Sequence, residues 1–185
     1  QDSLINSAIK FSNYFNSTSE ELYIASLPFF HIGGLMLIIR AVVNGAAIYI
    51  PNSLKVTDLL KGLDLQKDCY LSVVPTQLQD LINNNTYSKY LKAVIVGGAS
   101  TPVNLTIDSL KQNIPLYKVY GSSETCSMVS IANSVELKEF PMCSGRAFND
   151  NYINISDEGE VIVKSDTLFT AYYKQKEETN RKLLN

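Results

Sequence analysis

Short apolar runs alternate with segments of helical periodicity along most of the chain. Ile5, Ala8, Ile9 and Phe15 are spaced for one face of a helix over residues 3–15. The same pattern predicts strands at 21–27, 46–50, 70–74, 92–96 and 116–119, and helices at 35–44, 56–63, 76–83 and 102–112. Strands that alternate with helices indicate an α/β fold with a mostly parallel sheet flanked by helices.

Local signals mark several element ends. Gly45 is placed to cap the C-terminus of the helix over 35–44. Thr101 followed by Pro102 is typical of an N-cap and a first helical position. The strand over 46–50 is apolar throughout, so we expect it to be buried.

The pattern changes after about residue 140. Strands are expected at 152–155 and 160–164, joined by the turn Asp157-Glu158-Gly159. The charged stretch 174–181 predicts a surface helix or loop. We therefore divide the chain into an α/β subdomain over 1–140 that carries the pocket loops, and the start of a smaller β-rich subdomain over 141–185.

Composition narrows the class of protein. Hydrophobic residues make up 45% and charged residues 18%, which predicts a packed globular core. The formal net charge is -2 and no basic block occurs, so nucleic acid and anionic membranes are disfavoured as partners. The longest apolar run, 35–43, is too short to span a bilayer and contains Arg40. No signal peptide opens the chain, and because it begins with Gln1 we expect it to be part of a longer protein.

Cysteine and histidine usage excludes several kinds of site. Cys69, Cys126 and Cys143 are odd in number and match no zinc motif, which favours reduced thiols in a cytoplasmic protein. His31 is the only histidine, so no site in this chain can use two imidazoles. Cys126 has no second histidine or nearby cation in sequence, and a small buried thiol is favoured over a nucleophile.

Three glycine-containing loops follow predicted strands, at 28–34, 97–99 and 120–125. Ligands of open α/β sheets bind at the carboxyl ends of the strands. Glycine lets backbone approach a ligand closely, and each loop adds polar side chains or flat rings. The three loops together predict one ligand site.

The loop 120–125 has the most specific chemistry. Tyr120 offers a ring for stacking on a base, Ser122 and Ser123 offer hydroxyls to phosphate, and the Glu124 carboxylate suits Mg²⁺. A plain turn is the alternative: its hydroxyls cap a following helix, and Glu124 lies in the first turn of that helix. Composition alone favours this alternative.

Four ordered motifs resemble the adenylate-forming superfamily of acyl-CoA synthetases, peptide synthetase adenylation domains and luciferases. Residues 120–124 are similar to its adenine- and magnesium-binding motif, 97–99 to its glycine loop, and 27–31 to its aromatic-histidine motif. Residues 159–163 with 171–173 resemble its Gly-Glu strand and Gly-Tyr-Tyr segment. Ala171 and Ala147 depart from the usual glycine and proline, without touching a catalytic role.

The resemblance implies a role for each matching residue. Tyr120 stacks on adenine, Ser123 holds a phosphate, and Glu124 binds Mg²⁺. His31 lies at the lip of the acyl pocket, near the reacting carboxylate. The implied ATP-binding set is Gly97, Gly98, Ala99, Tyr120, Gly121, Ser122 and Ser123, and the implied catalytic set is His31, Ser123 and Glu124.

The resemblance also implies which parts of the machinery lie elsewhere. The phosphate loop usually found upstream, the Thr-Gly-Asp segment that holds the ribose, and the C-terminal lid domain with its catalytic lysine are not in this sequence. We therefore expect the chain to cover the middle and later part of the large N-terminal domain, and to be inactive alone.

Residues 31–34 with Arg40, and 124–127, are most similar to the subfamily of o-succinylbenzoate–CoA ligases of menaquinone synthesis. Arg40 lies in an apolar run and needs a partner. The second carboxylate of o-succinylbenzoate suits a guanidinium, whereas a structural ion pair within the protein is an equal alternative. His31, Arg40 and Ser127 form the expected substrate-binding set.

The resemblance implies an AMP-forming ligase that uses a small carboxylate, ATP, Mg²⁺ and coenzyme A. Another acyl-CoA synthetase or an amino-acid adenylation domain is the alternative within the superfamily, although no acidic residue for a substrate amine is evident near His31 or Gly97. A non-catalytic nucleotide-binding relative is the alternative from another class. A homo-oligomer is compatible with the sequence.

Overall fold

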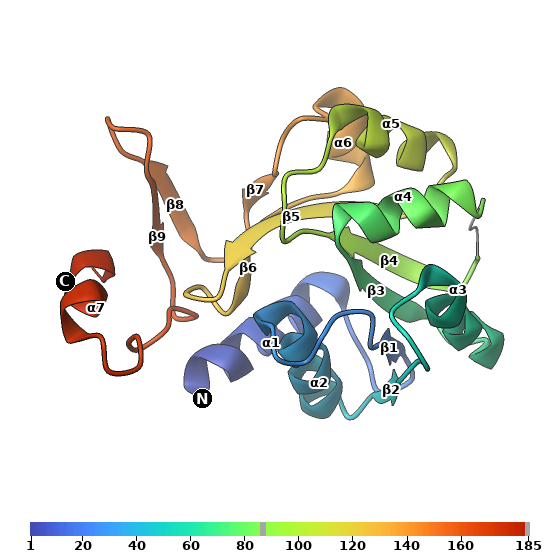
Figure 1. Ribbon diagram of the computed structural model, residues 1–185, viewed down its shortest axis with the longest axis horizontal. Helices are drawn as coiled ribbons and strands as arrows, with labels where there is room; N and C mark the ends of the chain where they lie inside the picture. Colours follow the sequence, from blue (N-terminus) through green and yellow to red (C-terminus); the bar gives the residue numbers. More distant parts are fainter. Residues whose placement is uncertain (86–87, 184–185) are drawn as a thin grey trace.

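Most strands lie in one seven-stranded sheet, in the order β2-β1-β3-β4-β5-β6-β7 (Figure 1). The computed structural model describes residues 1–85 and 88–183. Its strands are β1 (Leu22–Ile24), β2 (Ala47–Tyr49), β3 (Cys69–Val73), β4 (Leu91–Val96), β5 (Leu116–Ser122), β6 (Ser127–Ala132), β7 (Arg146–Ala147), β8 (Tyr152–Ile155) and β9 (Val161–Lys164). Strands β1 to β5 pair in parallel, whereas β6 and β7 pair antiparallel, which confirms the mostly parallel α/β fold.

Helices cover both faces of this sheet (Figure 1). Alternation along the strands separates two cores: Leu22 and Ile24 pack with helices α3 to α6, and Tyr23 between them packs with α1 and α2. The helices are α1 (Asp2–Phe15), α2 (Ile32–Asn44), α3 (Val56–Leu59), the 3₁₀-helix η1 (Leu60–Leu65), α4 (Pro75–Asn83), α5 (Val103–Lys111), α6 (Ser134–Glu139) and α7 (Lys176–Lys182).

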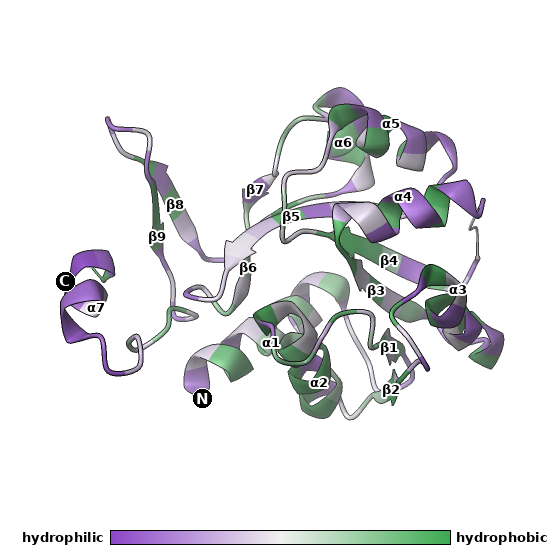
Figure 2. Cartoon of the chain, viewed as in Figure 1, coloured by the Kyte–Doolittle hydropathy of each residue, from purple (hydrophilic) through white to green (hydrophobic). Residues whose placement is uncertain are grey.

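The remaining segment forms a separate two-stranded antiparallel sheet, β8–β9. The expected turn at 157–159 joins the two strands, with Gly159 at φ 82°. Helix α7 follows and is mostly hydrophilic (Figure 2). Lys10 in α1 ties this segment to the rest through Asp150 at 2.6 Å and Asp166 at 2.5 Å. The division of the chain at residues 140 and 141 stays a prediction.

Several local expectations are corrected. Helix α2 begins at Ile32, so the glycines at 33 and 34 lie in its first turn instead of before it. The strand expected to be buried at 46–50 is shorter and is the partly exposed edge of the sheet. Pro102, not Thr101, is the N-cap of α5. Helix α1 exposes Ile5 and Ile9, while Phe11 takes their expected place in the core. The C-cap at Gly45 is confirmed, with φ 63°.

Candidate functional site

A cavity of about 440 Å³ opens where the strand order reverses. The chain passes from β1 outward to β2, then returns to β3 on the other side of β1. Crevices at such a switch point, outside the carboxyl ends of the strands, bind ligands in open α/β sheets. Leu27 and Pro28 after β1 line this cavity, as do residues 72–74 at the end of β3. The topology therefore builds the cavity where the three glycine-containing loops were expected to meet.

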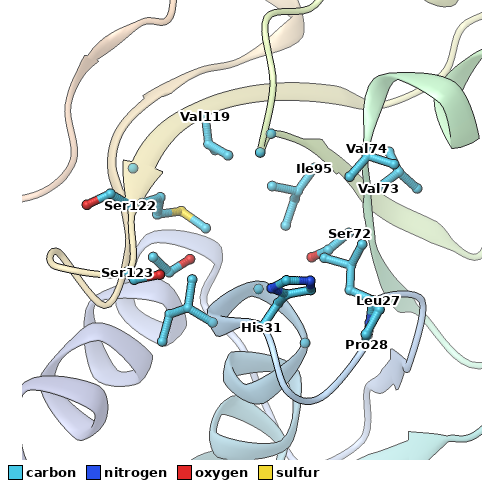
Figure 3. A pocket seen from close by; sticks show the side chains of 18 of the residues that line it. Leu27, Pro28, His31, Ser72, Val73, Val74, Ile95, Val119, Ser122 and Ser123 are labelled. Carbon is cyan, nitrogen blue, oxygen red and sulfur yellow. The ribbon is translucent and has the colours of Figure 1, made fainter. Parts of the chain in front are cut away.

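The first loop brings His31 to the cavity. Pro28 accepts a hydrogen bond from the backbone N–H of His31 at 3.1 Å, which turns the chain into α2. His31 is the N-cap of that helix, is exposed, and points toward the cavity (Figure 3). The next three residues, 32–34, line the cavity with the N-terminal turn of α2, where free N–H groups and the helix dipole favour an anion.

The second loop supplies Gly97 and Gly98 to the lining, but not Ala99. The N–H of Gly97 donates to the Val73 carbonyl at 3.2 Å, so the ends of β3 and β4 stay paired up to the cavity. Ala99 is exposed beyond that edge.

The third segment is a hairpin, not a turn before a helix. Strand β5 runs through residues 120–122, and β6 returns antiparallel from Ser127. No helix therefore follows in which Glu124 could lie in the first turn. A Cβ added to Gly121 would lie 1.8 Å from the Ser127 carbonyl oxygen, so only glycine fits. Ser122 and Ser123 lie across the cavity from Val73 and Val74 (Figure 3). The helix-capping alternative is therefore wrong.

Thr125 holds this hairpin turn from inside. Its hydroxyl donates to the Ser127 carbonyl at 2.8 Å and accepts from the Ser122 N–H at 2.9 Å. Cys126 and Ser127 have positive φ, 49° and 98°, which is costly for residues with a Cβ and is typical of functional sites. The turn is thus a strained and well-braced element beside the cavity.

Arg40 reaches the cavity wall from the middle of α2. Arg40 is buried, with 2% of its surface exposed, and its guanidinium carbon lies 4.2 Å from the centroid of the Phe11 ring. Nη2 donates to the Ser127 hydroxyl at 3.1 Å, whereas the buried Nε has no hydrogen-bond partner within the described residues. Burial lowers the pKa of Arg40 to about 10, with Tyr23 opposing the shift, so the group stays charged at neutral pH.

The structural ion pair that was one of the two alternatives for Arg40 is not found among residues 1–85 and 88–183. Salt bridges there join other lysines and arginines to carboxylates, and none includes Arg40. A charged guanidinium without a counter-charge, facing a cavity, is suited to bind an anionic ligand.

Tyr120 and Glu124 lie outside the cavity lining. Tyr120 is 45% exposed on β5. Glu124 accepts a hydrogen bond from the Tyr172 hydroxyl at 2.6 Å. That bond, the backbone N–H of Glu124 and the Ser122 hydroxyl together lower the pKa of Glu124, so its carboxylate is ionised at neutral pH. No cluster of three or more His, Cys, Asp or Glu side chains forms a metal site in the part of the chain that is described.

The structure thus brings together His31, Arg40, Gly97, Gly98, Gly121, Ser122, Ser123 and Ser127 around one cavity, and leaves Ala99, Tyr120 and Glu124 at its surroundings. Sequence reasoning missed Phe11 and Ser72, and it gave Tyr172 a place in the 171–173 motif but no role. Ser72 interrupts an apolar strand and lines the cavity, which is a signal that could have been followed. Nothing local marks Phe11 as the platform of Arg40, because the two helices meet only in the fold.

Comparison with known proteins gives a family match over residues 1–173, to the AMP-binding enzymes. The chain is 30% identical over 173 residues to the 2-succinylbenzoate–CoA ligase of Oceanobacillus iheyensis, covering 87% of this chain and 35% of that protein.

Solved structures share the fold. The o-succinylbenzoate CoA synthetase MenE of Bacillus subtilis, in complex with the acyl-adenylate intermediate OSB-AMP, superposes with a TM-score of 0.92 at 22% identity, over 100% of this chain and 40% of that one. The same enzyme with ATP and magnesium ion gives a TM-score of 0.90 at 21% identity, over 100% and 41%. The chain therefore spans between 35% and 41% of the length of these relatives. No described helix is long and apolar enough to cross a membrane.

Proposed function

The chain belongs to the AMP-binding enzyme family, and we propose that the full-length protein is an ATP-dependent acid–thiol ligase that converts o-succinylbenzoate into its coenzyme A thioester. In the first half-reaction, a carboxylate oxygen attacks the α-phosphorus of ATP and pyrophosphate leaves. In the second, the thiol sulfur of coenzyme A attacks the acyl carbon, AMP leaves, and the thiol proton passes to solvent.

The buried guanidinium of Arg40 carries the choice of acyl group. Arg40 is the only Arg, Lys, Asp or Glu among the described residues that line the cavity. A dicarboxylate fits this arrangement, because one carboxylate reacts while the other neutralises Arg40. An amino-acid substrate fits less well, since the described lining contains no carboxylate for its amine.

The remaining lining suits a reaction that depends on positioning and on charge. The free N–H groups at the start of α2, beside His31, favour the reacting carboxylate. Ser122 and Ser123 line the cavity, and their hydroxyls are suited to donate to phosphate oxygens, that of Ser122 by turning its proton from Glu124 to the phosphate. Gly97 and Gly98 leave the wall open for a flat ligand, and the half-exposed ring of Tyr120 is available for stacking on adenine.

Glu124 fits the metal that this chemistry needs. Mg²⁺ in nucleotide sites uses one or two carboxylates and takes its other ligands from phosphates and water, so a cluster of protein ligands is not required. Glu124 is ionised and lies next to the serines of the hairpin. When bound, Mg²⁺ neutralises charge that develops on the phosphates. The relative solved with ATP and magnesium ion supports this choice of metal.

ATP–pyrophosphate exchange by the full-length protein tests the proposal. We expect exchange with o-succinylbenzoate, and little with amino acids, with a fatty acid, or with a monocarboxylic analogue that lacks the second carboxylate. Exchange that prefers a monocarboxylic acid would move the protein to another acyl-CoA synthetase, and no exchange with any acid would leave a nucleotide-binding relative without this activity.

A further inference from the structure

Glu124 is bound by a segment that lies far from it in sequence. The Tyr172 hydroxyl donates to Oε1 of Glu124 at 2.6 Å, and the backbone N–H of Phe169 donates to the Glu124 carbonyl at 2.7 Å. Side chain and backbone of the same residue are therefore both held by the short stretch 169–172, between β9 and α7.

Tyr172 is itself fixed in place. Its backbone N–H donates to the hydroxyl of Thr179 at 3.0 Å, and Thr179 is 8% exposed in α7. Its ring lies 4.7 Å from the ring of Phe169, centroid to centroid. These contacts restrict the phenol before any ligand binds.

Helix α1 braces the two segments on another side. The Ser7 hydroxyl donates to the Cys126 carbonyl at 2.6 Å, two residues after Glu124, and the Ser3 hydroxyl donates to the Leu168 carbonyl at 2.7 Å, next to Phe169. The hairpin turn and the stretch 169–172 are thus held by one common helix.

We propose that Tyr172 is a positioning residue, whose hydroxyl holds the Glu124 carboxylate in the conformation that binds Mg²⁺. The proposal rests on the function proposed above. An ionised carboxylate has about four acceptor positions, so the bonds from Tyr172, from the Ser122 hydroxyl and from its own backbone N–H still leave capacity for a cation. A glutamate side chain has three rotatable bonds, and fixing them in advance lowers the cost of binding. Removing such a partner of a metal ligand typically weakens metal binding about tenfold or more.

The test is Tyr172→Phe in the full-length protein, which removes the hydroxyl and keeps the ring. Tyr173→Phe is the matched control. Tyr173 is 83% exposed, and its hydroxyl makes no hydrogen bond among the described residues. Binding of Mn²⁺ to the protein–ATP complex, followed by electron paramagnetic resonance without any acid, measures the metal site independently of the acyl substrate. The Mg²⁺ dependence of pyrophosphate exchange measures it under turnover.

For Tyr172→Phe we expect Mn²⁺ affinity to fall about tenfold and the half-saturating Mg²⁺ concentration to rise by a similar factor. At saturating Mg²⁺ the exchange rate should recover to about the wild-type value, and the melting temperature without ligand should be that of Tyr173→Phe. In a Glu124→Gln background, Tyr172→Phe should add nothing further, because the hydroxyl acts through that carboxylate.

Two results with Tyr172→Phe would overturn the inference. One is unchanged Mn²⁺ affinity in Tyr172→Phe while Glu124→Gln loses it, which would leave the proposed function standing without the tyrosine. The other is a rate loss that saturating Mg²⁺ does not rescue, together with a lower melting temperature, which is the signature of a purely structural contact. If Glu124→Gln also leaves Mn²⁺ affinity unchanged, the metal role of Glu124 fails and this inference fails with it.

Discussion

Replacing Arg40 by methionine should separate stability from substrate choice. Methionine is unbranched and apolar, so it can fill the space of the guanidinium stem against Phe11. The substitution removes a buried charge that has no carboxylate partner in the described residues. Removing this charge relieves a desolvation penalty of several kcal/mol. It also removes a cation–π contact with Phe11, of about 0.5–2 kcal/mol, and one hydrogen bond to Ser127. We expect the free energy of unfolding without ligand to be unchanged or raised by about 1–2 kcal/mol.

The effect on the reaction should have the opposite sign. A charge-assisted hydrogen-bonded contact to a carboxylate contributes about 1.5–3 kcal/mol, which is roughly ten- to a hundredfold in kcat/KM. The loss should fall on o-succinylbenzoate and be much smaller for the analogue without the second carboxylate. Arg40→Lys keeps the charge but loses the planar fork, so we expect an intermediate loss.

Steady-state pyrophosphate exchange with both acids, and urea unfolding of the ligand-free protein, are the assays. Equal losses on the two acids, accompanied by a lower free energy of unfolding, would refute the reasoning. That outcome would mean that Arg40 supports the packing of α1 on α2 instead of the substrate.

Other substitutions test the architecture. Gly121→Ala should destabilise the protein by about 3 kcal/mol in urea unfolding, because its Cβ would meet the Ser127 carbonyl, and an unchanged midpoint would contradict the hairpin geometry. Lys10→Met should lower the melting temperature at pH 7. Lys10 lowers the pKa of Asp150, so this stabilisation exists above about pH 4 and is lost as pH falls through the lowered pKa. The pKa of Lys10 is raised despite burial, by Asp150 and Asp166, so the stabilisation is also lost as pH rises above about 10.5. A wild-type advantage that is the same at pH 3 and pH 7 would contradict this. The 185-residue chain alone should form no acyl-adenylate, since it spans less than half the length of the relatives it matches; pyrophosphate exchange by the isolated chain would contradict that expectation.

Periodicity predicted most helices and parallel strands, because the hydrophobic pattern of each element lies within its own stretch of sequence. Helix α4 and strand β4 differ from their expected bounds by one residue at one end. Strand β6 and helix α6 were not predicted at all. Residues 127–132 mix small, polar and apolar side chains, and they become a strand through pairing with β5 and β7. The exposure of β2 has the same cause, since only the strand order makes it an edge.

The part of the candidate site that is formed by loops at strand ends was predictable from the sequence. Glycines and hydroxyls after β1, after β4 and within the hairpin converge because carboxyl ends of parallel strands meet at one edge. The environment of Arg40 was not predictable, because Phe11 and Ser127 reach it from α1 and β6. The contact from Tyr172 to Glu124 joins residues 48 positions apart and has no local signature.

Isotope transfer tests the central claim, adenylate formation, most directly. The full-length protein would be given ATP, coenzyme A, Mg²⁺ and o-succinylbenzoate labelled with ¹⁸O in its carboxylates. Since a carboxylate oxygen attacks the α-phosphorus and stays on phosphorus when the thiol displaces AMP, we predict AMP that carries one ¹⁸O, together with the acyl-CoA thioester. Unlabelled AMP, or ADP and phosphate as the products, would contradict the account.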